Sequence, residues 1–258
     1  MPDTIKERLN RGEFVRILGI SRVLHHNIIQ ILGINGGFHG VWFDLEHVGN
    51  AFENIEIATI AARASGLDSF VRLPPTDYAI VTRCLEAGAS GVMAAQIQDA
   101  AHAIEFVSWT RFHPDGTRGL NSGGWDAQYS TIPLPEFCRS ANANRFVAIQ
   151  IETLGALQEC DAIAAIDGVD SLFIGPSDLS QNLGITGDFM NPRCIEAVEQ
   201  VGAACRRHGK HLGAVSVSPD HARMLKNAGC NLFSPANDVR VINAGIAAIK
   251  ETYSEFFD

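Results

Sequence analysis

The fold is decided by residues 146–180, FVAIQIETLGALQECDAIAAIDGVDSLFIGPSDLS. This stretch holds two apolar runs, 146–151 and 171–174, which are too short for helices and have the continuous apolar character of strands buried on both faces. A carboxylate follows each run, and these two residues, Glu152 and Asp178, are one strand–helix–strand repeat apart. Parallel strands end at one edge of a sheet, so we expect the two carboxylates to lie close together and to share a proton, a cation or a cationic side chain.

The same alternation of apolar runs and helical segments extends along the whole chain. Strands are predicted at 15–19, 40–43, 69–73, 91–95, 146–151, 171–174, 211–215 and 232–234. Helices are predicted at 3–10, 24–33, 53–65, 77–87, 98–112, 154–165, 191–208, 220–228 and 239–257. Such regular spacing suits right-handed βα units, and eight of them predict a (β/α)8 TIM barrel. A doubly wound open sheet is the alternative, but no G-x-G-x-x-G motif follows a predicted strand.

Two connections are longer than usual for a compact domain. Residues 112–145 are rich in Gly, Pro, Ser and Asn, with one short helix expected at 134–142, and residues 175–190 form the second long connection. Long connections are often lids or binding segments. We expect both to leave the C-terminal ends of strands, which form the catalytic face of a barrel. The chain is therefore predicted to be a single barrel domain over 1–258 with a long insertion at 112–145.

Composition excludes several classes of partner. The net charge of −9 argues against nucleic acid and anionic membranes. No apolar run reaches the ~18 residues of a membrane span, and the charged N-terminus does not read as a secretory signal, so a cytoplasmic location is expected. The cysteines form no C-x-x-C pair, and we expect buried thiols rather than zinc ligands or disulfides. They are Cys84, Cys138, Cys160, Cys194, Cys205 and Cys230.

Polar side chains close four of the predicted strands. They are Asp44, His47, Arg72, Gln150, Glu152 and Asp178. Any one of them could serve the fold alone, as a helix cap or an ion-pair partner, but six on one face of a barrel favour a site. Carboxylates with water and ligand oxygens suit Mg²⁺ or Mn²⁺ rather than zinc or copper. A fixed guanidinium and the N–H groups at the start of a short helix at 178–183 favour an anion. The predicted substrate is a small 2-oxo acid that chelates the ion.

The lysines test a covalent alternative. Barrel aldolases that form a Schiff base need a lysine at the mouth. The chain has four lysines, Lys6, Lys210, Lys226 and Lys250. Three of them fall in predicted helices, and Lys210 precedes a strand at the opposite face. An enolate stabilised by a metal ion is therefore favoured over an imine.

Six motifs spread over nearly the whole chain point to one family. They are FDLEHVGN at 43–50, VRLPPTD at 71–77, EAGASGVMAAQI at 86–97, RGL at 118–120, AIQIET at 148–153 and GVDSLFIGPSDLSQNLGITGDF at 168–189. Together they resemble the HpcH/HpaI aldolase family of metal-dependent class II pyruvate aldolases, which includes 4-hydroxy-2-oxo-heptane-1,7-dioate and 2-keto-3-deoxy acid aldolases and is more distantly related to the citrate lyase β-subunit. The resemblance implies a phosphoenolpyruvate/pyruvate-type barrel whose last helix packs on a neighbouring subunit of a homo-oligomer, a trimer or hexamer.

The resemblance also implies how the ion and the substrate are bound. It places the metal ligands at Glu152 and Asp178, for Mg²⁺ or Mn²⁺ and, as a further candidate, Co²⁺. The pyruvate-binding arginine and amide correspond to Arg72 and Gln150. Backbone N–H groups at Ser177 and Asp178 would hold the pyruvate carboxylate.

The implied catalytic groups lie after the second predicted strand. The catalytic histidine corresponds to His47 and its acid partner to Asp44, while Glu86 matches a carboxylate that reaches the mouth across a subunit boundary. The expected reaction is reversible cleavage of a 4-hydroxy-2-oxo acid to pyruvate and an aldehyde through a metal-bound pyruvate enolate. The alternatives are an acyl-CoA lyase of the citramalyl- or malyl-CoA type, an oxaloacetate decarboxylase that uses the same enolate, and a non-catalytic binding module.

Three departures from the family pattern bear on the aldehyde half of the substrate. Residues 94–95 are both alanine, which would widen the mouth. Arg22, His25 and His26 follow the first strand, where relatives carry small polar residues, and the last strand ends in SPANDV at 234–239. We expect all three positions near the aldehyde or its tail.

Overall fold

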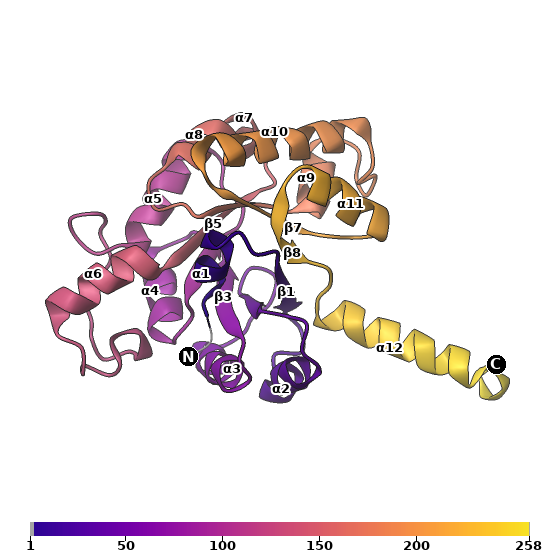
Figure 1. Ribbon diagram of the computed structural model, residues 1–258, viewed down its shortest axis with the longest axis horizontal. Helices are drawn as coiled ribbons and strands as arrows, with labels where there is room; N and C mark the ends of the chain where they lie inside the picture. Colours follow the sequence, from indigo (N-terminus) through magenta and orange to yellow (C-terminus); the bar gives the residue numbers. More distant parts are fainter. Residues whose placement is uncertain (1–2, 258) are drawn as a thin grey trace.

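A computed structural model describes residues 3–257 and shows a closed barrel of eight parallel strands paired in chain order (Figure 1). The strands are β1 (Val15–Ile20), β2 (Gly40–Asp44), β3 (Asp68–Leu73), β4 (Gly91–Ala94), β5 (Phe146–Ile151), β6 (Ser171–Ile174), β7 (His211–Val215) and β8 (Cys230–Ser234). The predicted (β/α)8 barrel is confirmed.

Helices alternate with the strands along the chain. They are α1 (Ile5–Asn10), α2 (His26–Asn35), α3 (Phe52–Ala64), α4 (Tyr78–Glu86), α5 (Ala100–Thr110), α6 (Leu134–Asn144), α7 (Leu154–Gln158), α8 (Cys160–Ala165), α9 (Pro176–Asn182), α10 (Pro192–His208), α11 (Pro219–Asn227) and α12 (Asp238–Thr252), with 3₁₀ turns η1 (Trp125–Ala127) and η2 (Ser254–Phe256). The helix predicted over 154–165 is two helices, because the backbone at Glu159 leaves the helical region.

Alternation along the strands divides the core into an inner and an outer layer. Every second residue points into the barrel, where Phe70, Phe146 and Phe173 pack together, and α1 closes the amino-terminal end with Ile5 and Leu9. Further along the same strands, the inward positions become polar where they reach the mouth. The alternation of side chains along the strands therefore directs the polar residues at the strand ends into the mouth of the barrel.

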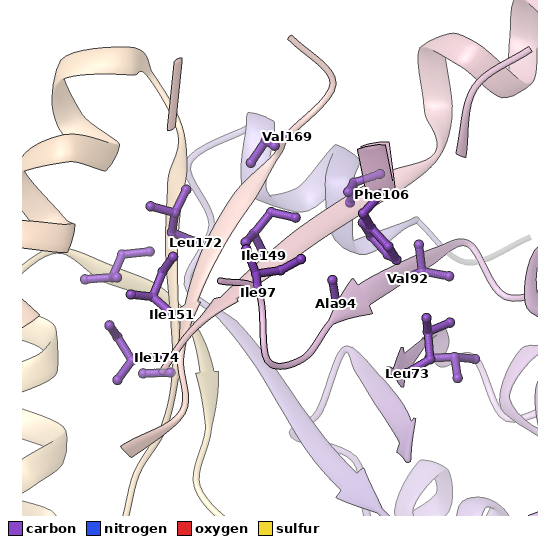
Figure 2. Packing of buried hydrophobic residues seen from close by; sticks show 14 of the residues in the cluster. Leu73, Val92, Ala94, Ile97, Phe106, Ile149, Ile151, Val169, Leu172 and Ile174 are labelled. Carbon is purple, nitrogen blue, oxygen red and sulfur yellow. The ribbon is translucent and has the colours of Figure 1, made fainter. Parts of the chain in front are cut away.

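The outward positions form the larger layer of the core. Side chains such as Val92, Ile149 and Leu172 are fully buried between the strands and the surrounding helices. Figure 2 shows part of this layer around β4, β5 and β6. Because this layer surrounds the strands that precede Glu152 and Asp178, it holds the ends of β5 and β6 in a fixed relation.

The long segment before β5 does not lie at the mouth, which corrects the expectation of a lid there. It follows helix α5 rather than a strand, so it crosses the amino-terminal end of the barrel. Its own small core joins Phe112 to Phe137. Inside the segment, a salt bridge joins Arg118 to Asp126 at 2.5 Å, and both side chains are fully buried. The connection after β6 does leave the carboxyl end, as predicted.

Helix α12 extends away from the barrel, with the C-terminus at its far end (Figure 1). Only Asp238, at its first turn, is buried. A stripe of apolar side chains at helical spacing is exposed along the rest, formed by Ile242, Ile246, Ile249 and Tyr253. The helix therefore presents an uncovered apolar face.

Two expectations from composition can be compared with the structure. All six cysteines are unbonded, and five of them are buried, as predicted, with Cys138 half-buried. Over residues 3–257, no helix combines the length and the apolar character needed to cross a bilayer.

Candidate active site

The carboxyl ends of the strands enclose a cavity of about 290 Å³. Its lining comprises Trp42, His47, Arg72, Gln150, Gly175, Pro176, Ser177, Asp178, Val215, Val217, Ala236, Asn237 and Arg240. This volume lies at the small end of the range of about 300–1,000 Å³ for ligand pockets. A compact polar molecule fits it better than a large cofactor.

Arg72 is fixed in the mouth by Asp44. The two residues are register neighbours on β3 and β2, and Nε and Nη2 of Arg72 donate to the two carboxylate oxygens of Asp44 at 3.1 and 2.7 Å. Burial opposes ionisation of Asp44, but the hydrogen bonds and charge of Arg72 outweigh it and keep the pKa of this carboxyl below its usual value. The guanidinium also lies over the ring of Trp42, 4.9 Å from its centroid.

Glu46, rather than Asp44, lies next to the imidazole of His47. Oε2 of Glu46 is 3.5 Å from Nε2 of His47 and 3.2 Å from Nη1 of Arg72. Burial raises the pKa of Glu46, and the charge of Arg72 only partly opposes this. The predicted Asp44–His47 pair therefore differs from the structure, because the adjacent strand already engages both oxygens of Asp44. The exposed ring of His47 faces the cavity.

Glu152 lies just after β5 and is completely buried. Its Oε1 accepts the backbone N–H of Gln96 at 2.8 Å, and its Oε2 accepts Nε2 of Gln150 at 2.5 Å. Gln96 holds a left-handed backbone, φ 53°, to present this N–H. Burial raises the pKa of Glu152 to about 7, and the negative charges of Glu46 and Asp178 contribute in the same direction.

The surroundings of Glu152 suit a divalent cation. No ion pair joins its carboxylate to a basic side chain in the part of the chain that the structure describes, and its acidic neighbours destabilise the ionised form. A bound cation would pair with the buried carboxylate and would also offset the repulsion from its acidic neighbours. Within residues 3–257, no three His, Cys, Asp or Glu side chains group tightly enough to form a complete site. Mg²⁺ needs only one or two carboxylates, since waters and substrate oxygens complete its shell.

Gly175 provides space beside this carboxylate. A Cβ atom at this position would collide with Oε2 of Glu152 and Nε2 of Gln150. The glycine therefore allows the start of α9, with Ser177 and Asp178, to approach the end of β5 closely. The structure thus brings together the ends of β5 and β6, as the stretch from 146 to 180 predicts.

Several expected residues lie away from the cavity. Glu86 is at the end of α4, on the opposite side of its own barrel from the mouth, where its carboxylate accepts Nδ2 of Asn121. His25 and His26 are exposed, stack on each other and do not line the cavity, and Arg22 is exposed as well. Ala94 is buried in the outer core and Ala95 is fully buried as well, and neither alanine lines the cavity.

Sequence reasoning missed several residues of the mouth. Trp42 looks like an ordinary strand residue, but it stands on the inward face two positions before Asp44, and its indole N–H donates to Ser234. Arg240 lies in a predicted helix and reaches the mouth because α12 starts at the rim. The alternation of β2 was a usable signal for Trp42, whereas the position of Arg240 depends on the loop geometry.

Comparison with known proteins decides the family. The model of the HpcH/HpaI aldolase/citrate lyase family matches residues 24–243, which include every strand from β2 to β8. The chain belongs to this family. It is therefore an enzyme of the aldolase type, a carbon–carbon lyase acting in the manner of class II pyruvate aldolases.

Two curated relatives that this chain resembles are named aldolases. The chain is 33% identical over 219 residues to the 4-hydroxy-4-methyl-2-oxoglutarate aldolase of Hapsidospora irregularis, covering 82% of this chain and 78% of the relative. It is 27% identical over 226 residues to the 5-keto-4-deoxy-D-glucarate aldolase of Klebsiella pneumoniae, covering 88% and 87%. Among solved structures, an HpcH/HpaI aldolase/citrate lyase family protein from Burkholderia cenocepacia superposes with a TM-score of 0.88 at 30% identity, covering 96% and 98%.

Proposed function

We propose that this enzyme reversibly cleaves a 4-hydroxy-2-oxo acid to pyruvate and an aldehyde, with a divalent metal ion as cofactor. The observation that carries the proposal is Glu152, a fully buried carboxyl that has no basic partner among the described residues and lies beside a mouth with Asp178 and a fixed guanidinium. A 2-oxo acid has the carboxylate and keto oxygens that such a mouth would bind.

Residues at the ends of β3, β5 and β6 would bind the pyruvate half of the substrate. Glu152 and Asp178 would hold Mg²⁺, Mn²⁺ or Co²⁺, and the ion when bound supplies a Lewis acid for the 2-oxo acid. Nε2 of Gln150 donates to Glu152 and orients it. The other polar atom of this amide, Oε1 of Gln150, is buried with no hydrogen-bond partner among residues 3–257. Arg72 places positive charge where negative charge develops on the keto oxygen. The N–H groups of Ser177 and Asp178 would bind the substrate carboxylate.

Proton transfer falls to His47. In the cleavage direction the imidazole removes the proton of the C4 hydroxyl, directly or through one water, and the C3–C4 bond then breaks to release the aldehyde. Oε2 of Glu46 lies 3.5 Å from the imidazole without a hydrogen bond and would orient it through its charge, while Asp44 holds Arg72. This assigns the two acids of the β2 end to different partners, in place of a single dyad.

Deuterium exchange into the methyl group of pyruvate tests the proposal without knowledge of the aldehyde. We expect exchange with Mg²⁺, Mn²⁺ or Co²⁺ that stops after chelation and returns when the ion is restored. Glu152→Gln and Asp178→Asn should each lower the exchange rate by at least about 100-fold. An enzyme that exchanges at full rate after chelation and dialysis would contradict the metal assignment, and no exchange with any of these ions would contradict the enolate.

We also propose that the enzyme is a homo-oligomer in which α12 packs on a neighbouring subunit. The apolar stripe on this helix, which includes Ile246 and Ile249, is about half exposed in the single chain. A stripe of that kind on a helix that leaves its own barrel favours a partner of the same sequence.

A further inference from the structure

The ends of β7 and β8, next to β6 in the closed barrel, form the wall of the cavity across from β3 and its Arg72. It consists of Val215, Val217, Ala236 and Asn237, with Arg240 at the rim. Apart from Asn237 and Arg240, these residues are apolar. If the proposed 2-oxo acid lies against Arg72 and Gln150, the aldehyde half of the substrate faces this wall.

Arg240 is held at the rim by its own chain. Its Nη1 donates to the backbone carbonyls of Ser216 and Pro235 at 2.8 and 3.3 Å, and its Nη2 donates to that of Val217 at 3.2 Å. The first turn of α12 is fixed as well, because the buried carboxylate of Asp238 accepts the N–H groups of Ser21 and Val23. The guanidinium therefore stays at the mouth wherever the rest of α12 packs.

The charge of Arg240 has no acidic partner within residues 3–257. Arg72 contacts both Asp44 and Glu46, whereas Arg240 contacts no carboxylate of this part of the chain. The three carbonyls occupy both N–H groups of Nη1 and one of Nη2. The N–H of Nε and the second N–H of Nη2 remain, and they form the same fork with which Arg72 holds Asp44.

We infer that Arg240 binds a carboxylate on the aldehyde half of the substrate and thereby determines specificity. The inference rests on the proposed aldolase function and adds a residue that distinguishes acceptor aldehydes with a carboxylate from neutral ones. A paired guanidinium fork matches a carboxylate bidentately. The small cavity limits the distance between the two acid groups. Arg240 selects the substrate and does not take part in proton transfer.

Paired acceptor aldehydes test this assignment in the aldol direction. Glyoxylate carries a carboxylate, and glycolaldehyde is its neutral counterpart of similar size. We expect Arg240→Gln to lower kcat/KM for glyoxylate by about 10–100-fold, chiefly through KM, because a hydrogen bond to a charged group is lost. The change for glycolaldehyde should stay below about threefold, and Arg240→Lys should recover part of the preference for glyoxylate.

Two controls distinguish binding of the substrate by Arg240 from a general effect of surface charge or of altered loops. Arg22→Gln removes an exposed cation outside the cavity lining and should leave the ratio of the two kcat/KM values unchanged. Deuterium exchange into pyruvate should be the same in wild type and Arg240→Gln. Absence of exchange in the wild type would contradict the proposed function itself. Normal exchange together with an equal loss for both aldehydes in Arg240→Gln would overturn only the role of Arg240, which would then merely support the loops after β7 and β8.

Discussion

At the scale of single residues, the buried carboxyl of Glu152 makes the stability of the metal-free protein depend on pH. Burial raises its pKa to about 7 from the usual 4.5. Well below pH 4.5 the group is protonated in both the folded and the unfolded state, so its burial does not change the free energy of unfolding. As the pH rises to about 7, the unfolded state loses its proton more readily, and the folded state loses up to about 3 kcal/mol of stability relative to it.

Glu152→Gln removes this titration and keeps the shape of the side chain. The buried Oε1 of Gln150 can turn toward the new amide. In urea denaturation with a chelator present, the variant should therefore gain stability over the wild type between pH 5 and pH 8, by up to about 3 kcal/mol. The same stability difference at both pH values would show that Glu152 does not titrate in this range.

The two acids at the end of β2 should give different kinetic losses. Glu46→Gln weakens the orientation of His47, so aldol cleavage should slow by about 10–100-fold while deuterium exchange into pyruvate falls much less. Asp44→Asn releases Arg72, so both reactions should slow together. Assays of both reactions on each variant decide the pairing, and a selective loss of cleavage in Asp44→Asn would restore the Asp44–His47 pair.

At the scale of elements, the segment between α5 and β5 depends on the buried carboxylate of Asp126, which pairs with Arg118 and also lies 3.8 Å from Nη2 of Arg145. Arg118 and Asp126 have no exposed side-chain area, so Asp126→Ala leaves a buried charge without its partner and should lower the free energy of unfolding by about 3–5 kcal/mol. As a matched control, Asp161→Ala breaks the exposed pair with Arg207 and should cost less than about 1 kcal/mol. Urea denaturation of both variants measures the difference, and equal losses would contradict the buried pair.

The sequence predicts the strands better than it predicts the position of this segment or the pairing of the acids after β2. Strands β5, β6 and β7 follow from their apolar runs because both faces are buried, and the 26-residue interval between Glu152 and Asp178 fixes the common edge of β5 and β6. The end of the barrel that a loop occupies depends on whether it leaves a helix or a strand, and its length alone does not reveal this. Likewise, Asp44 and Glu46 are close neighbours in the sequence, and only the register of β2 with β3 assigns Arg72 to Asp44.

At the scale of the whole molecule, the extended helix α12 has consequences for assembly. Ile246 and Ile249 on this helix are 51% and 55% exposed, because no part of the same barrel packs against them. In the proposed oligomer a neighbouring subunit buries them, and the affinity between subunits then depends on this apolar stripe. The first turn of the same helix lies at the active site, where Asn237 and Arg240 line the cavity. One helix therefore contributes both to the cavity and to the proposed subunit interface.

The double variant Ile246→Asp/Ile249→Asp separates these two roles of α12. The new charges would have to be buried against the neighbouring subunit, so we expect the oligomer to dissociate into monomers of 27.9 kDa, as measured by light scattering after size-exclusion chromatography. Ala244→Asp, on the opposite face of the helix, is the control and should leave the oligomer intact. A wild type that is itself monomeric, or a double variant with unchanged mass, would contradict packing through this stripe. The substitutions lie beyond the first turn that Asp238 anchors, so the fold of each barrel should survive dissociation.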